Sequence, residues 1–222
     1  MRSTFAASAR QAGPRAFTLV ELLVVLTIVA IVSALVIPSV GPMMSSYNLN
    51  QAGSMVSDEL SFARQAALTR NADVEVRFYQ TGTTAKATDL QFRAFRSFLA
   101  NSTAPTQAVA LDKLSYLPGN VIISSTADPA NSPSTFSPLL DYTNHSTVLT
   151  TGTDTLPNGT SATYVSFLFR ATGGTNLVPV ATLWYVTVCP ENAKTVTTTG
   201  LPGNYVTVQV DPVIGQVRTF RP

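Results

Sequence analysis

The sequence predicts an α+β protein in which a long N-terminal spine helix, membrane-embedded in its first half, packs on an antiparallel β-sheet head. Three observations lead to this prediction. An apolar run occupies residues 17–37, and an apolar stripe with helical spacing follows it. Alternation of apolar and polar residues then starts near residue 73 and returns until the C-terminus. The 222 residues are enough for one ordinary domain and a membrane segment.

The apolar run contains a single charged residue, Glu21. As a helix, residues 17–37 span roughly 30 Å, which is enough to cross the hydrocarbon core of a membrane. We therefore assign residues 17–38 to a transmembrane helix. Three arginines precede it within residues 1–16, at positions 2, 10 and 15, without an acidic residue among them. The positive-inside rule then predicts a cytoplasmic N-terminus, with the bulk of the chain on the outer side of the membrane.

Three kinds of N-terminal segment fit an apolar run of this length. The first is a secretory signal peptide with the small residues 32–34 as its cleavage site. The second is an uncleaved anchor, and the third is a prepilin signal that is cut before the apolar run. Glu21 favours the third, because an ionisable group in an apolar helix costs up to about 3 kcal/mol and needs a reason. Cleavage before Phe17 creates an α-amine one helical turn from the Glu21 carboxylate.

The segment Arg15-Ala16-Phe17-Thr18-Leu19-Val20-Glu21-Leu22 resembles the class III leader motif of type IV pilins and type II secretion pseudopilins. The resemblance implies that residues 1–16 are a leader peptide and that a prepilin peptidase cuts between Ala16 and Phe17. It also implies that the new amine of Phe17 is methylated and that Glu21 is the assembly glutamate. The family usually has glycine where this chain has Ala16, so we expect slower processing rather than none.

The same resemblance implies the function and the partners. The chain would be a structural subunit, a minor pilin or pseudopilin, of a type IV pilus or a type II secretion-like filament, and not an enzyme. It would lie in the inner membrane with a periplasmic head, in contact with lipid, until an assembly platform and a cytoplasmic ATPase extract it into a filament. There Glu21 would neutralise the terminal amine of a neighbouring subunit, which sets the axial register because an unpaired buried charge is unfavourable.

Residues 39–72 are predicted to form the outer half of the spine helix. Pro38 ends the uninterrupted apolar run, so we expect a kink there. Beyond it, apolar residues recur at intervals of three and four, which predicts a stripe that packs against the head. The stripe consists of Leu49, Ala52, Val56, Leu60, Ala63 and Ala67. The charged residues Asp58, Glu59, Arg64 and Arg70 are expected on other faces.

The head, residues 73–222, is predicted to contain a sheet of about six strands. Candidate strands are 73–79, 90–98, 121–124, 163–171, 181–188, 205–210 and 216–220. Residues 73–79 alternate in a pattern typical of a half-buried strand, and the last two strands bracket a hairpin turn at 211–215. Residues 107–117 are expected to form a short helix or turn. Ser, Thr, Asn, Pro and Gly dominate residues 124–162, which predicts a long surface loop.

Two further resemblances lie in the spine and the head. Residues 62–71 and 208–218 are similar to minor pseudopilins of the H type. Residues 69–79 and the final Arg-Pro resemble the D member of the Verru_Chthon cassette, a group of proteins with a prepilin signal. These resemblances narrow the relatives without implying an activity.

The residues offer little for catalysis. We find no sequence motif of a hydrolase, a nucleotide-binding loop or a metal site, and expect neither cofactor nor metal. Cys189 is the only cysteine and is expected to be a small buried hydrophobe, while the only histidine, His145, is expected in an exposed loop. Trp184 and Tyr185 should lie on opposite faces of one strand.

An alternative function is a tip pilin that binds a ligand or DNA. Arg218 and Arg221 near the C-terminus would supply a weak basic patch for phosphates. Three of the fourteen basic residues lie in 1–16, which leaves eleven against twelve acidic residues from Phe17 onward. This near-neutral balance argues against nucleic acid as a partner.

Overall fold

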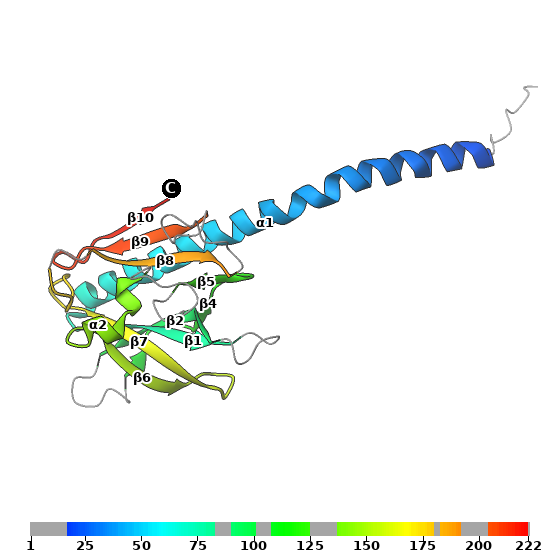
Figure 1. Cartoon of the computed structure of the whole chain (residues 1–222). Coiled ribbons are helices and arrows are strands. Elements are labelled where there is room, and N and C mark those ends of the chain that lie inside the picture. Colours follow the sequence, from blue (N-terminus) through cyan, green and yellow to red (C-terminus); the bar gives the residue numbers. More distant parts are fainter. Residues whose placement is uncertain are drawn as a thin grey trace, which may run out of the picture. The chain divides into compact units, whose positions relative to one another are not determined.

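A computed structural model describes residues 17–82, 90–100, 108–124, 137–179, 183–191 and 204–221, with only the backbone described for 35–42. The chain divides into two units, residues 1–43 and 44–222. Helix α1 (Leu19–Arg70) is a single helix of 52 residues that contributes to both units (Figure 1).

The first unit contains the N-terminal part of α1. All described side chains from Phe17 to Ala34 are exposed. The side chains around Pro38 lie outside the described residues, so the kink expected there stays a prediction. Within the part of the chain that the structure describes, no helix is both long enough and apolar enough to cross a membrane.

The second unit combines the remainder of α1 with a ten-stranded sheet in which every pairing between strands is antiparallel. The strands are β1 (Val74–Thr81), β2 (Gln91–Leu99), β3 (Val109–Ala110), β4 (Ser115–Tyr116), β5 (Val121–Ile123), β6 (Thr150–Thr155), β7 (Ser161–Phe169), β8 (Trp184–Pro190), β9 (Val206–Val210) and β10 (Val217–Phe220). Their order is β10-β9-β8-β5-β2-β1-β7-β6, with β3 and β4 paired to β2. The predicted α+β fold class, a helix packed on an antiparallel sheet, is confirmed.

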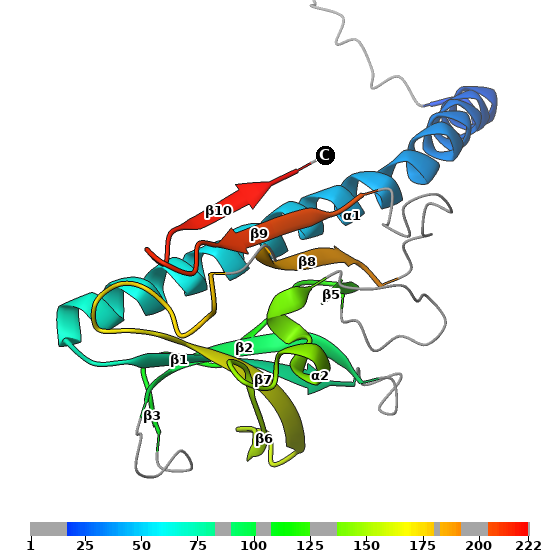
Figure 2. The same ribbon diagram turned by 60° about the vertical axis from the view of Figure 1, so that its left-hand side comes forward.

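The helix–sheet interface contains the main hydrophobic core. All six residues of the predicted stripe between Leu49 and Ala67 have no exposed surface, so this stripe is confirmed as the packed face. Figure 2 shows α1 running alongside β9 and β10. At Gly53 the helix comes so close to β9 that an added Cβ atom would lie 2.7 Å from Cγ1 of Val206. Glycine therefore permits the close approach of helix and sheet.

Most predicted strands are present with small shifts at their ends, but two segments differ from the prediction. Residues 107–117 were expected to form a helix or turn, whereas residues 108–117 contain β3 and β4. Both are short strands that pair with β2, so β2 supplies the hydrogen bonds that these residues cannot make locally.

The prediction of a long surface loop over residues 124–162 is wrong for its described part. Residues 137–162 contain the 3₁₀ helix η2 (Pro138–Leu140), the short helix α2 (Tyr142–His145), β6 and the start of β7. The leucines of this segment are buried, among them Leu139, Leu149 and Leu156. Isolated leucines give no periodic signal, so their burial depends on the neighbouring strands rather than on local pattern.

Strand β1 is also more buried than its alternating pattern predicts. Val74, Val76 and Phe78 face the main core, but Tyr79 on the opposite face is equally buried. Tyr79 belongs to a second apolar cluster that includes Tyr164 and residues of β2 and β7. Because β1 lies between β2 and β7 and both of its faces are covered, it is a central strand rather than a half-buried one.

Candidate functional site

The N-terminus of α1 is stabilised by a side-chain cap. The backbone N–H of Glu21 donates a hydrogen bond to Oγ1 of Thr18 at 3.2 Å, and the N–H of Leu22 donates to the backbone oxygen of Thr18 at 3.2 Å. Thr18 followed three residues later by Glu21 is the sequence pattern of a capping box. This role of Thr18 was not predicted, although the Thr-x-x-Glu spacing indicates it.

Glu21 therefore has a fixed place in the first turn of the helix. A carboxylate there interacts favourably with the unpaired backbone N–H groups at the positive end of the helix dipole. The side chain of Glu21 is exposed, and it forms no ion pair with any described residue. Glu21 thus lies one turn from Phe17, and its carboxylate is accessible to a group outside the chain.

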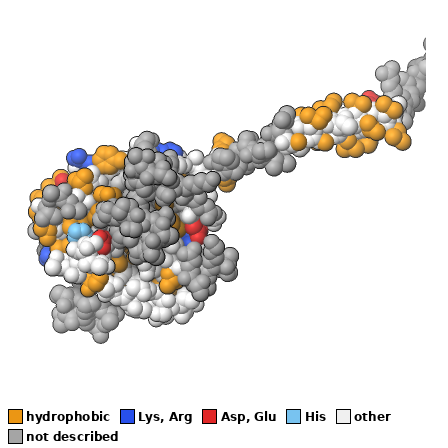
Figure 3. Space-filling view, in the orientation of Figure 1, with side chains coloured by type: hydrophobic (Ala, Val, Ile, Leu, Met, Phe, Trp, Pro, Cys, Tyr) orange, Lys and Arg blue, Asp and Glu red, His pale blue; other side chains and the backbone are white. Residues whose placement is uncertain are grey.

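The helix surface around and beyond Glu21 is apolar and exposed (Figure 3). Phe17 and Leu19 are 79% and 82% exposed, and the large apolar side chains from Val20 to Val32 are exposed as well. A helix that is apolar over its whole circumference is normally buried in a membrane or among other helices. The predicted cleavage site is only partly covered by the structure, because Ala16 lies outside the described residues.

Comparison with protein families identifies this segment. The family model of the prokaryotic N-terminal methylation motif matches residues 13–37. The chain carries a prepilin-type signal. This match confirms the resemblance that was based on residues 15–22. No curated protein matches the chain.

The chain is also similar to solved structures of two minor pilin-like proteins. One is the minor pseudopilin EpsH from the Type 2 Secretion System of Vibrio cholerae, at 8% identity and a TM-score of 0.40, covering 79% of this chain and 98% of EpsH. Another is the type IV minor pilin FimU of Pseudomonas aeruginosa, at 13% identity and a TM-score of 0.41. This match covers 78% of this chain and 92% of FimU. The resemblance to the Verru_Chthon cassette stays a prediction.

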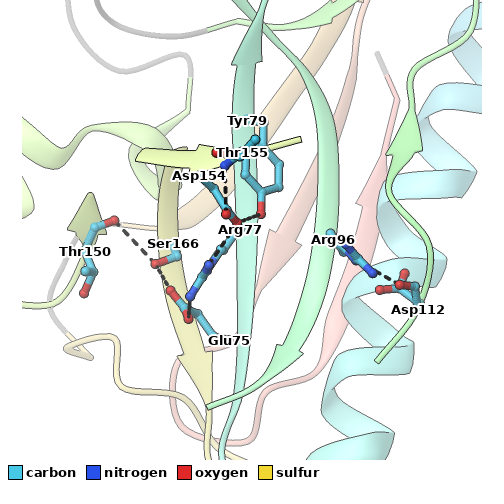
Figure 4. Close-up of polar contacts among 9 residues, drawn as sticks. All are labelled: Glu75, Arg77, Tyr79, Arg96, Asp112, Thr150, Asp154, Thr155 and Ser166. Carbon is cyan, nitrogen blue, oxygen red and sulfur yellow. Dashed lines mark hydrogen bonds and ion pairs between the residues drawn. The ribbon is translucent and has the colours of Figure 1, made fainter. Parts of the chain in front are cut away.

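The head contains a buried network of charged residues that was not predicted from the sequence (Figure 4). Nη2 of Arg77 donates to Oε2 of Glu75 at 2.7 Å, and Nη1 donates to Oδ2 of Asp154 at 3.1 Å. Oγ of Ser166 donates to the other oxygen of Glu75 at 2.6 Å. The network joins β1, β6 and β7. Its signal in the sequence was the opposite charges of Glu75 and Arg77, which lie on one face of a strand at a spacing of two.

Aromatic rings complete the surroundings of Arg77. Its guanidinium carbon lies 4.3 Å from the ring centre of Phe98 and 4.5 Å from that of Tyr164, so two cation–π contacts enclose it. Burial disfavours the charged form of Arg77, but the hydrogen bond and the charge of Glu75 outweigh it and raise the pKa of Arg77. The guanidinium is therefore a permanent cation that pairs with carboxylates on β1 and β6.

A second polar cluster connects α1 with the sheet. It includes Glu59, which was expected on a face of α1 other than the packed stripe but is buried. Glu59 is only 9% exposed, and its carboxylate accepts a hydrogen bond from the hydroxyl of Ser97 on β2. The backbone N–H of Ser97 donates to Oδ1 of Asp112 at 3.1 Å, and Nε of Arg96 donates to the Asp112 backbone oxygen at 2.9 Å. Glu59 is buried because it lies three residues after Val56, on the flank of the packed stripe.

The surroundings of Glu59 favour its neutral form. Burial raises the pKa of Glu59 to about 7, and the nearby charge of Asp112 adds to this effect although the Ser97 hydroxyl opposes it. Because the pKa of Glu59 in the folded chain exceeds its ordinary value of 4.5, the unfolded chain loses this proton at a lower pH than the folded chain does.

We expect the stability of the head to depend on pH through Glu59. Its contribution is fully present below about pH 4.5 and is lost as the pH rises through about 7, which amounts to about 2 to 3 kcal/mol in the free energy of unfolding. Urea unfolding of the native chain and of Glu59→Gln across this pH range measures it. The difference in the free energy of unfolding between the native chain and Glu59→Gln should change with pH. A difference that stays constant would contradict a raised pKa of Glu59.

The other residues that were singled out in the sequence pack against neighbouring parts of the head. Cys189 is buried, and burial raises its pKa to about 12, so it stays a thiol as expected. Trp184 is buried while Tyr185 is only partly buried, which confirms that they lie on opposite faces of β8. His145 corrects the prediction of an exposed loop residue: it is half-buried in α2, with its ring 4.8 Å from that of Trp184. Among the described residues, no group of His, Cys, Asp or Glu could hold a metal ion.

Proposed function

We propose that the chain is a structural subunit, a minor pilin or pseudopilin, of a type IV pilus or a type II secretion-like filament. One observation carries the proposal: a prepilin-type motif at residues 13–37 includes the start of a capped helix whose described apolar surface is exposed. Such a helix is covered by lipid before assembly and by the helices of other subunits afterwards. The folded head then supplies the outer surface of the filament.

Processing and assembly are linked in this proposal. A prepilin peptidase cuts between Ala16 and Phe17 and methylates the new amine, with the N-terminus on the cytoplasmic side of the inner membrane. The cap at Thr18 holds Glu21 in the first turn, so its carboxylate can neutralise the amine of a neighbouring subunit. The partners are other pilin-like subunits and an inner-membrane assembly platform. The chain itself performs no catalysis.

Mass spectrometry of the N-terminus tests the proposal. Protein isolated from its native host should begin with N-methylated Phe17. A matched variant, Ala16→Gly, restores the residue that the pilin family prefers and should be processed faster in a pulse-chase experiment. A chain that begins at Met1, or after Ala34 as a secretory signal peptide would leave it, contradicts the proposal.

A further inference from the structure

The outer face of strands β8, β9 and β10 carries a groove. Trp184 on β8 and Val208 on β9 face the core, as does every second residue of each strand. The residues that alternate with these core positions lie on the opposite face, away from α1. The register places Phe220 beside Thr207 and Thr207 beside Thr187, one residue from each strand. The groove has a volume of about 510 Å³ and is lined by Leu183, Tyr185, Thr187, Tyr205, Thr207, Gln209, Phe220 and Arg221.

The groove follows from the sizes of these side chains. Two threonines lie next to each other on β8 and β9, and aromatic side chains surround them: Tyr185, Tyr205 and Phe220. Short side chains between large rings leave a hollow in an otherwise even sheet face. Phe220 is half exposed, so one ring presents its surface to a ligand. The floor is thus polar and the walls are aromatic.

The hydroxyl of Thr187 has no partner within the part of the chain that the structure describes. Thr187 is 1% exposed, and among the described residues its Oγ1 has no hydrogen-bond partner. Its backbone N–H donates to Oγ of Ser137 at 2.9 Å, but this bond leaves the hydroxyl unused. Most buried polar side-chain atoms in proteins are hydrogen-bonded, so an unpaired hydroxyl that lines a groove indicates a place for a polar group of a ligand.

The charges at the groove are positive. Arg221 lines it, and its Nη1 donates to the neutral amide oxygen of Asn50 at 2.7 Å. Arg218 lies beside Gln209 in the register and donates to the neutral side chain of Gln216 at 3.0 Å. No acidic residue is among the described residues that line the groove. A ligand with a negative charge would therefore complement it.

We propose that this groove binds an acidic sugar, a uronic acid unit of a glycan. The aromatic walls pack against the apolar face of a sugar ring, and the hydroxyls and amide of the floor bind its hydroxyl groups. The carboxylate pairs with Arg221. This combination favours a carboxylated sugar over single-stranded nucleic acid, because two arginines supply few phosphate contacts. The binding site goes beyond the proposed role as a filament subunit and does not depend on it.

Isothermal titration of the full chain in detergent micelles with trigalacturonate tests the site. The native chain should bind it and should not bind maltotriose, a neutral sugar of equal length. Arg221→Gln and Thr187→Val should each weaken binding about tenfold, through loss of a charge-assisted and of a neutral hydrogen bond to the ligand. Arg70→Gln removes an exposed charge from the end of α1 and should leave the affinity unchanged.

Circular dichroism and the melting temperature establish that the variants fold. Thr187→Val keeps the shape of the side chain and removes only the unpaired hydroxyl, so it should not lower the melting temperature. The proposal is overturned if the native chain does not bind trigalacturonate, if maltotriose binds equally well, or if oligothymidylate binds more tightly. It is also overturned if Arg70→Gln weakens binding as much as Arg221→Gln does.

Discussion

Replacement of Glu21 by alanine is expected to abolish filament assembly while the chain still inserts into the membrane. Glu21 lies in the first turn of α1, where its backbone N–H donates to the Thr18 hydroxyl. In the proposed filament its carboxylate pairs with the Phe17 amine of a neighbouring subunit. Without Glu21 that amine would be buried unpaired, which costs about 3 to 5 kcal/mol per subunit. Removal of a charge from an apolar helix favours insertion, so only assembly should fail.

The measurement is the amount of subunit in isolated filaments relative to the amount in the membrane fraction. Glu21→Gln keeps the size of the side chain and separates charge from shape, so it should fail like Glu21→Ala. Asp58→Ala removes an exposed carboxylate farther along the same helix and should assemble normally. If Glu21→Gln assembled like the native chain, charge pairing would not set the register.

Replacement of Arg77 by methionine is expected to destabilise the head by about 3 to 5 kcal/mol, because it leaves two carboxylates of the network without their cation. Glu75 is 8% exposed and would lose its 2.7 Å partner. Asp154 would keep two neutral donors, the hydroxyl of Tyr79 and the backbone N–H of Thr155, each at 3.0 Å. Methionine retains much of the contact with the rings of Phe98 and Tyr164. The loss therefore measures charge more than packing.

Urea denaturation of the full chain in micelles, followed by circular dichroism, gives the free energy of unfolding. Arg70→Met is the matched control, since Arg70 is exposed at the end of α1, and it should change the stability by less than about 0.5 kcal/mol. Glu75→Leu combined with Arg77→Met removes both members of the closest pair and should recover part of the loss. A loss below about 1 kcal/mol for Arg77→Met alone would mean that the carboxylates find other partners.

Several features of this protein could be predicted because their signal is local. The stripe from Leu49 to Ala67 follows the helical period, and it packs against a single surface, the sheet. The turn between β9 and β10 is local as well: Oδ1 of Asp211 accepts hydrogen bonds from the N–H groups of Val213 and Ile214, and Gly215 adopts a φ of 64°. Sequence alone was sufficient for both.

Burial of the second face of β1 and of Glu59 on α1 could not be predicted in this way, because it depends on residues far apart in the chain. Glu75 binds Ser166, which lies 91 residues later, and Glu59 binds Ser97, which lies 38 residues later. An alternating strand or a charged residue beside a stripe has the same local pattern whether water or protein covers it. The burial of both β1 faces was for this reason not predicted.

The sequence by itself determined the N-terminal signal, the position of Glu21 one turn from Phe17, the spine helix and most strands of the head. These features rest on spacing within one or two turns of helix or along a single strand. Only the tertiary structure decided that residues 137–162 join the core, that Arg77 is enclosed by carboxylates and rings, and that β8–β10 form a groove. Each of these depends on strand order and register, which bring together side chains that are distant in the sequence. The local sequence pattern does not indicate these contacts.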